Sequence, residues 1–146
     1  MDKSWLTSEE AFSIYAPCMY QPTYEDYKAL MEKYFSDPSV KIFVCDMDSE
    51  KAGILVLKEI EAAEGSETGD EAEILGIAVK ENLREKGIGK EMIYQVMETE
   101  HLKTITAQTD DDAIGFYRKS GFEAERVVIE YPNGSVVRYN CSLTIE

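Results

Sequence analysis

The segment Glu73–Glu98, EILGIAVKENLREKGIGKEMIYQVME, decides how the rest of the chain is organised. Its first seven residues, Glu73–Val79, form a mostly apolar run with frequent β-branched side chains, which is typical of a buried strand. Gly87 and Gly89 follow in a short loop. Apolar residues then recur at helical spacing at Ile88, Met92, Ile93, Val96 and Met97. The segment therefore predicts a strand, a glycine loop and a helix in succession.

The junction between this strand and helix has the chemistry of an anion site. A helix N-terminus exposes unpaired backbone N–H groups and the positive end of the helix dipole. Gly87 and Gly89 have no Cβ atom, which lets an anion approach the backbone closely. Lys86 and Lys90 can add positive charge, although Lys90 is equally well interpreted as a solvent-exposed helix residue. A phosphate or pyrophosphate group is the ligand that this junction suits.

The loop differs from two common nucleotide-binding motifs. A P-loop needs Ser or Thr after Gly-Lys, and here Glu91 follows; the dinucleotide fingerprint needs a third glycine where this chain has Met92. The loop does match Arg/Gln-x-x-Gly-x-Gly/Ala, which this chain carries as Arg84-Glu85-Lys86-Gly87-Ile88-Gly89. This motif resembles the acetyl-CoA-binding loop of the GNAT superfamily of N-acetyltransferases.

A second motif supports the resemblance. The segment Asp110–Phe122, DDDAIGFYRKSGF, is similar to the family pattern Asn-x-x-Ala-x-x-Phe-Tyr-x-x-x-Gly-Phe, and it follows the first motif in the family's order. One difference is Asp110, which stands where the family commonly has asparagine, because a carboxylate lacks the amide's N–H donor. The resemblance covers nearly the whole chain and implies acetyl-CoA as the acyl-donor substrate.

The resemblance also implies where acetyl-CoA binds. The backbone of the central strand would bind the pantetheine arm, and N–H groups of the glycine loop would bind the pyrophosphate. The implied cofactor-binding residues are Ile77, Ala78, Val79, Arg84, Glu85, Lys86, Gly87, Ile88, Gly89, Lys90, Asp110 and Tyr117. We expect no metal site, because the cysteines match no ligand spacing.

Two residues are candidates for acid–base catalysis of acetyl transfer. Tyr117 matches the family tyrosine that can donate a proton to the departing thiolate, and the alternative is a core aromatic residue between Phe116 and Phe122. Glu73 falls where some family members carry a catalytic glutamate, and the alternative is an exposed charge at the start of a strand. Gly76, in the strand interior, indicates either a bulge or local packing against a bulky side chain.

Length and composition suit a single domain over residues 1–146. No stretch resembles a signal peptide or a membrane span, and three widely spaced cysteines suit a reducing cytoplasm. The formal net charge of −14 repels nucleic acid and attracts cationic amines. The simpler interpretation of the charge is an acidic surface that keeps the protein soluble.

The remaining patterns predict the other elements. In chain order these are a helix within Ser8–Tyr20 that ends near Pro17, a helix from Thr23 or Tyr24 to Ser36, strands Val40–Cys45 and Gly53–Ile60, the central strand and helix, strand Leu102–Gln108, helix Ala113–Lys119, and strands Glu123–Tyr131 and Val136–Leu143. An acidic linker, Glu61–Ala72, is interpreted as a solvent-exposed loop, with attraction of a cationic substrate as the alternative. His101 is expected to be structural.

The implied fold is α/β (α+β), with a mixed, mostly antiparallel sheet, helices on both faces and a splayed cofactor cleft. The family's first strand is weak or missing here. The implied function is direct transfer of acetyl from acetyl-CoA to a primary amine of a small molecule or peptide, with acceptor contacts at Pro17–Tyr24 and Tyr131–Gly134. Alternatives are a non-catalytic acyl-CoA-binding or regulatory module and an interaction protein without a cofactor. A homodimer is left open.

Overall fold

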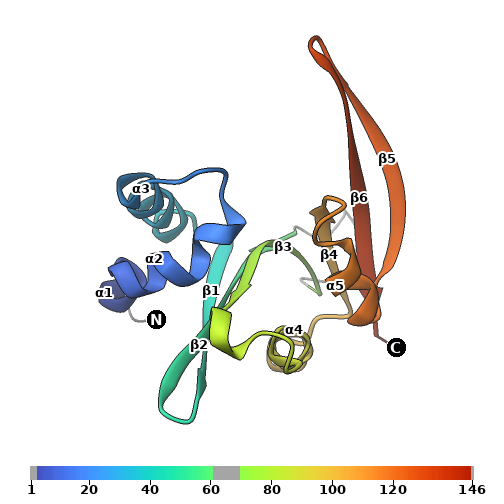
Figure 1. Ribbon diagram of the computed structural model, residues 1–146. Coiled ribbons are helices and arrows are strands. Elements are labelled where there is room, and N and C mark those ends of the chain that lie inside the picture. Colours follow the sequence, from blue (N-terminus) through green and yellow to red (C-terminus); the bar gives the residue numbers. More distant parts are fainter. Residues whose placement is uncertain (1–2, 61–69, 146) are drawn as a thin grey trace.

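The computed structural model describes residues 3–60 and 70–145, and these residues form one mixed sheet with helices on both faces (Figure 1). The sheet has six strands in the order β1-β2-β3-β4-β6-β5. Neighbouring strands are antiparallel except for β3 and β4, which are parallel. The strands are β1 (Val40–Met47), β2 (Glu50–Glu59), β3 (Glu71–Val79), β4 (Thr104–Thr109), β5 (Glu123–Tyr131) and β6 (Gly134–Thr144). The predicted fold class is confirmed.

The helices divide between the two faces and give each face its own core (Figure 1). On one face lie α1 (Lys3–Leu6), α2 (Glu9–Tyr15), the 3-10 turn η1 (Ala16–Cys18) and α3 (Tyr24–Phe35). On the other lie α4 (Ile88–Thr99) and α5 (Ile114–Lys119), with the 3-10 turn η2 (Glu81–Leu83) leading toward α4. The apolar stripe of α4 that the sequence shows, from Ile88 to Met97, is buried in the second core.

Helix boundaries follow the capping residues. Ser8 caps α2 by accepting a hydrogen bond from Ala11 N, and Thr23 and Asp26 form a capping box at the start of α3. The first predicted helix is shorter than expected, since regular α-helix ends at Tyr15 and Pro17 lies in η1. Helix α1 was not predicted, and the described chain before β1 contains helices and turns but no strand.

The strands were predicted with small errors at their ends. Strand β3 begins at Glu71 rather than Glu73, so the end of the predicted acidic linker belongs to the sheet, while residues 61–69 lie outside the described part of the chain. Strand β4 begins at Thr104 rather than Leu102. Strand β6 begins at Gly134 rather than Val136, because the turn contains only Pro132 and Asn133 and Gly134 already pairs with Tyr131.

Strands β3 and β4 separate along their length, and this fork is the main irregularity of the sheet. They pair only from Glu71↔Thr104 to Ile74↔Ala107. At the same place the register between β2 and β3 shifts, with Val56 opposite Gly76 but Leu57 opposite Ile74. Leu75 is therefore the extra residue of a β-bulge, which bends a strand and ends regular pairing. Beyond Ile74, no strand in the described chain pairs with this edge of β3.

Candidate active site

The edge of β3 that faces the fork carries backbone N–H groups that bond to no neighbouring strand in the described chain. Lys80 N donates to Ala52 O, so in this antiparallel ladder alternate residues of β3 bond to β2. The amides of Ile77 and Val79 then point the other way, into the fork. Ala78 differs from them, because its backbone faces β2 and its side chain is buried against the α1–α3 core.

Two side chains bind the carbonyls that point into the fork. Cys18 Sγ donates to Ile77 O at 3.2 Å, and Arg84 Nε donates to Val79 O at 3.0 Å. Cys18 comes from η1, so the fork brings together segments 59 residues apart in the sequence. Although Cys18 is an exposed residue, desolvation of its thiol raises its pKa to about 11. Nothing in the sequence pattern indicated Cys18, since its spacing matches no motif and only the fold places it here.

The glycine loop ends at an open helix N-terminus. Gly87 is the N-cap residue of α4, with φ +79°, and a Cβ atom there would meet nothing within 4 Å. No side chain caps this helix, so its first N–H groups, from Ile88 onward, lack a side-chain acceptor among the described residues. Lys86, Lys90 and Glu85 are exposed around this end.

Gly89 has a packing role that the sequence did not indicate. A Cβ atom at Gly89 would lie 2.8 Å from Cε1 of Phe116, so the glycine allows α4 to pack against α5. Gly89 is buried, whereas Gly87 is exposed. Glycine is therefore required at the two positions for different reasons. Gly87 has a left-handed backbone conformation, and Gly89 allows two helices to pack closely.

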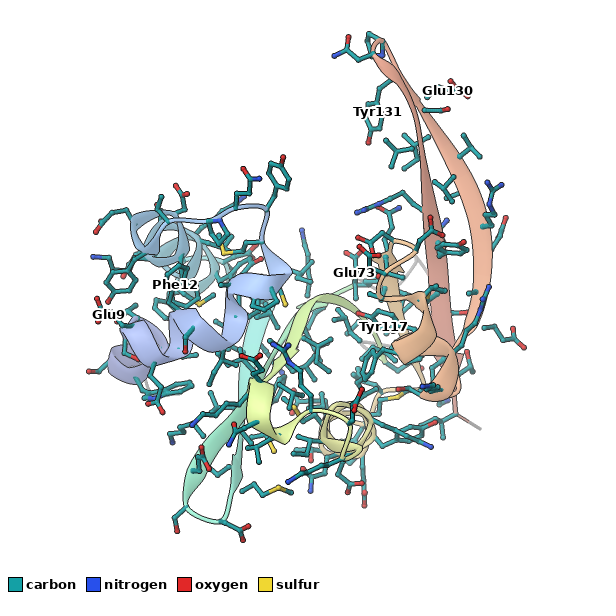
Figure 2. All side chains as sticks on the ribbon, in the orientation of Figure 1. Glu9, Phe12, Glu73, Tyr117, Glu130 and Tyr131 are labelled. Atoms are coloured by element: carbon teal, nitrogen blue, oxygen red, sulfur yellow. The ribbon has the colours of Figure 1, made fainter. Side chains whose placement is uncertain are left out.

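Tyr117 lies on α5 at the base of the fork and is 6% exposed (Figure 2). Its ring packs edge-on against the rings of Phe116 and Phe122, with ring centroids 5.1 and 5.2 Å apart. Tyr117 is therefore part of the aromatic core, as the alternative interpretation of the sequence expected. Burial raises the pKa of Tyr117, and electrostatic interactions with Cys18 and Cys141 raise it further. The phenol thus stays protonated at neutral pH, and its hydroxyl has no hydrogen bond within the described chain.

Glu73 lies on the opposite face of the sheet from α4 and lines a cavity of about 500 Å³ (Figure 2). It is the third residue of β3 and half-buried, so it is not the strand-end charge that the sequence allowed. Its cross-strand neighbours are Lys58 of β2 and Thr106 of β4. The cavity begins where β3 and β4 separate, because Ala107, the last β4 residue paired with β3, also lines it.

Asp110 uses its carboxylate to hold the turn before α5. Its Oδ1 accepts the backbone N–H groups of Asp112 and Ala113, both at 3.1 Å. These two hydrogen bonds need only an acceptor, so aspartate forms them as well as asparagine does.

The two tyrosines near the expected contacts with the acetyl acceptor differ in their exposure and contacts. Tyr20 is 90% exposed, whereas the Tyr24 hydroxyl donates to Thr7 O and its ring stacks with Lys28.

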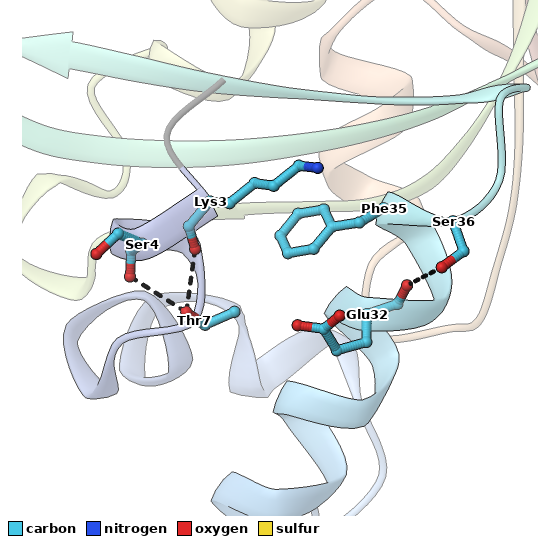
Figure 3. Close-up of a pocket in the computed structure, with 6 residues that line it drawn as sticks. All are labelled: Lys3, Ser4, Thr7, Glu32, Phe35 and Ser36. Carbon is cyan, nitrogen blue, oxygen red and sulfur yellow. Dashed lines mark hydrogen bonds between the residues drawn. The ribbon is translucent and has the colours of Figure 1, made fainter.

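A second cavity, of about 410 Å³, lies between α1 and the end of α3, away from every predicted site residue (Figure 3). Its hydroxyl groups bond to nearby backbone: Thr7 donates to Lys3 O, and Ser36 to Glu32 O. Lys3 Nζ lies 5.3 Å from the centroid of the Phe35 ring. These hydroxyl groups bond to backbone carbonyl groups of α1 and α3, and we assign the cavity no role.

The described residues contain no group of His, Cys, Asp and Glu side chains that could hold a metal ion. Within the same residues no helix is both long and apolar enough to cross a membrane.

Comparison with known proteins identifies the family. The family model described as "Acetyltransferase (GNAT) family" matches residues 8–122. The chain therefore belongs to the GNAT acetyltransferase family. No curated protein matches the chain.

Solved structures of acetyltransferases have the same fold. An acetyltransferase from Bacillus subtilis in complex with CoA has 20% identity and a TM-score of 0.65, with 95% of this chain and 93% of that one covered. A GNAT-family protein from Desulfovibrio desulfuricans has 16% identity and a TM-score of 0.72, with 100% and 95% covered. The ribosomal-protein-S18-alanine N-acetyltransferase from Escherichia coli has 14% identity and a TM-score of 0.67, with 100% and 91% covered.

Proposed function

We propose that this acetyltransferase moves an acetyl group from acetyl-CoA to a primary amine, by direct transfer while both substrates are bound. The observation that carries the proposal is the free edge of β3 at Ile77 and Val79, followed along the chain by the uncapped N-terminus of α4. An extended pantetheine arm, which carries amide groups, would complete the strand edge. A pyrophosphate would meet the N–H groups of the helix.

Other features support acetyl-CoA as the donor. The Bacillus subtilis structure contains CoA, and a streptothricin acetyltransferase structure from Bacillus anthracis contains acetyl coenzyme A. In this chain Gly87 leaves the helix N-terminus open, since nothing lies within 4 Å of where its Cβ would be. Lys86 and Lys90 are exposed beside it and can neutralise phosphate charge.

The chemistry needs a base, an acid and an oxyanion donor. The amine nitrogen attacks the thioester carbonyl carbon, the carbon–sulfur bond breaks, and the sulfur leaves with the electron pair. We assign Glu73 to accept the proton that the amine loses and Tyr117 to donate a proton to the leaving sulfur. We assign stabilisation of the oxyanion to a backbone N–H at Ile77 or Val79, because these amides point into the fork.

Direct transfer, without an acetyl-cysteine intermediate, is supported by Cys18. This thiol lies at the fork, but its pKa is raised to about 11, so very little thiolate exists at neutral pH. The thiolate is the nucleophilic form of cysteine. Cys18 is thus poorly suited to accept the acetyl group, and the amine itself is the better nucleophile.

Binding of acetyl-CoA to the glycine loop is tested by calorimetric titration of wild type and of Lys86→Glu/Lys90→Glu. We expect the double variant to bind at least tenfold more weakly, because two attractive charges become repulsive at the phosphate site. Lys103→Glu is the matched control, since Lys103 is also exposed but follows the C-terminal end of α4. A substitution at Gly89 would be less informative, because it disturbs the contact with Phe116.

Three results have distinct meanings. Weaker binding in the double variant alone supports the loop site, and transfer to an amine then supports the enzyme. Binding without transfer to any of a broad set of amines would favour a non-catalytic acyl-CoA-binding module. A folded wild-type protein that binds no acetyl-CoA would overturn the proposal.

A further inference from the structure

Strand β5 lies at one end of the sheet, and its outer edge pairs with no strand of the described chain. On its inner side the register with β6 is unbroken from Glu123↔Ser142 to Tyr131↔Gly134. The hairpin of β5 and β6 extends well beyond helix α5 (Figure 1), and β4 pairs with β6 only as far as Tyr139. A long, exposed strand edge of this kind is a template for pairing with another chain.

The hydrogen-bond pattern of the sheet determines which residues of β5 present their backbone groups to this edge. Ile145 N donates to Lys103 O, so the odd-numbered residues of β6 bond to β4 and the even-numbered ones bond to β5. Even-numbered residues of β6 pair with odd-numbered residues of β5. The backbone N–H and C=O groups of Arg126, Val128 and Glu130 therefore point outward, where no backbone group of the described chain bonds to them.

The sequence of this edge is self-complementary. In ERVVIEY, residues 125–131, Arg126 and Glu130 stand two residues to either side of Val128, and Val127 and Ile129 stand one residue to either side. An antiparallel second copy of the strand, centred on Val128, places each Arg126 opposite Glu130 of the other copy. It also places Val127 opposite Ile129 of the other copy. The edge thus matches itself in both charge and apolar side chains.

Other registers of the same pairing lose this match. A centre at Arg126 places two arginines opposite each other, and a centre at Glu130 does the same with two glutamates. A centre one residue to either side of Val128 leaves Arg126 with no carboxylate directly opposite. The charges therefore select the register centred on Val128.

Arg126 and Glu130 are available for such a contact. Both are exposed, and neither forms an ion pair within residues 3–60 and 70–145. They are four residues apart on one face of β5, about 13 Å along a strand, which is too far for them to pair with each other. Strand β1, at the other end of the sheet, has a register shift between Cys45 and Asp46, a feature that discourages pairing at an edge.

We propose that the protein forms a two-fold homodimer by antiparallel pairing of β5 with β5 of a second copy, centred on Val128, so that the two sheets become one. This contact goes beyond the proposed function and does not depend on it. The formal net charge of −14 repels a second copy, so the paired strands supply the attraction locally. At physiological salt the Debye length is about 8 Å, which screens distant charges far more than directly opposed pairs.

The first test is sedimentation velocity at physiological salt over a range of protein concentrations. We expect wild type to reach twice the chain mass of 16.5 kDa. Arg126→Glu and Glu130→Arg should each weaken dimerisation about tenfold or more, because each places two pairs of like charges opposite one another. The double variant Arg126→Glu/Glu130→Arg restores both pairs with reversed signs and should dimerise within about threefold of wild type.

Glu130→Arg also separates the register from the effect of net charge. This substitution makes the protein less negative, so general repulsion alone predicts stronger association, the opposite of the expected weakening. Glu98→Arg is the matched control, because it changes the charge equally at an exposed residue of α4. The control should dimerise at least as well as wild type.

The second test locates the centre of the contact without relying on charge. Val128→Cys brings two thiols together if the strands pair at this residue, since Cα atoms of a hydrogen-bonded antiparallel pair lie about 5.5 Å apart, within the range of a disulfide. Val136→Cys is the matched control, because Val136 is 45% exposed and Val128 49%, but Val136 belongs to β6. Oxidation with diamide should link the first variant through position 128 and leave position 136 of the second unlinked, as peptide mass spectrometry would show.

Several results would overturn the proposal. A wild-type protein that stays monomeric at every soluble concentration would do so, and would leave the edge to an extended segment of a different protein. A dimer that both single reversals leave intact, or that the double variant does not restore, would place the second copy on another surface. Equal cross-linking of the two cysteine variants would exclude Val128 as the centre.

Discussion

The hydroxyl of Tyr15 lies directly over Gly76, so close that a Cβ atom at this glycine would stand 1.9 Å from Tyr15 Oη. Tyr15 is the last residue of α2 and is 1% exposed, and Gly76 follows the bulged Leu75 in β3. The contact joins the helix to the strand at the point where β3 leaves β4. Both interpretations of Gly76, a bulge and packing against a bulky side chain, are therefore realised at adjacent residues.

Gly76→Ala is expected to destabilise the fold. The added methyl group would also meet Tyr15 Cζ at 2.6 Å, so the whole ring must move. Overpacking of this kind costs about 1–3 kcal/mol in the free energy of unfolding. Urea denaturation followed by circular dichroism measures the change.

Gly115→Ala is the control for that measurement. Gly115 lies within α5, and a Cβ atom there would meet nothing within 4 Å. In a helix interior alanine is favoured over glycine by about 0.5–1 kcal/mol. The control should be at least as stable as wild type, and an equally stable Gly76→Ala variant would contradict the packing argument.

Tyr117→Phe is expected to lower kcat by about a hundredfold to ten-thousandfold, as loss of a general acid does, and to leave the dissociation constant of acetyl-CoA within twofold. Burial keeps the pKa of Tyr117 above its ordinary value, so the phenol is protonated across the neutral range. The loss should therefore be the same between about pH 7 and pH 9, well below the ordinary tyrosine pKa. Stopped assays at several pH values test this, and a wild-type kcat in the variant would remove the acid role.

The sheet could be predicted from the sequence because its strands are local patterns, with β5 predicted at its exact ends. Glu73, Tyr117 and the glycine loop could also be found, since each belongs to a motif. Cys18 could not. It approaches the fork only through the path of η1, and a contact between segments so far apart leaves no spacing in the sequence. Gly89 was predicted as part of an anion-binding loop, but its packing against Phe116 could not be predicted, because Phe116 lies 27 residues away in the chain.

Glu73→Gln is expected to reduce kcat about a hundredfold, because an amide cannot accept the amine proton. The variant should bind acetyl-CoA like wild type. Glu71→Gln is a close control, since Glu71 lies two residues earlier on the same face of β3 but does not line the cavity. Equal kcat in Glu73→Gln and Glu71→Gln across the pH range would exclude Glu73 as the base.

Stability should fall in alkali. Burial raises the pKa values of Tyr15, Tyr27 and Tyr117 above their unfolded values, so the native state holds these phenols neutral. Their contribution is complete below the unfolded pKa, about 10, and is lost as the pH rises toward the native values. The free energy of unfolding should therefore decrease between about pH 9 and pH 11.

Tyr27→Phe, which also loses the hydrogen bond to Leu6 O, should be less stable at pH 7 and should show a smaller decrease in the free energy of unfolding over this pH range. A slope equal to that of wild type would contradict this.

Acetyl-CoA should protect Cys18 from alkylation by iodoacetamide. The Cys18 thiol donates to Ile77 O, which lies on the strand edge that we assign to the pantetheine arm. Because the pKa of Cys18 is raised to about 11, labelling without ligand should be slow at neutral pH and rise about tenfold per pH unit below that value. Saturating acetyl-CoA should then slow labelling of Cys18 at least tenfold.

Cys45, on β1 and half-buried, serves as the internal control and should react at the same rate with and without the ligand. Peptide mass spectrometry resolves the two cysteines. If acetyl-CoA binds by calorimetry while Cys18 reacts at an unchanged rate, the cofactor does not lie along Ile77, and the fork loses its assigned role.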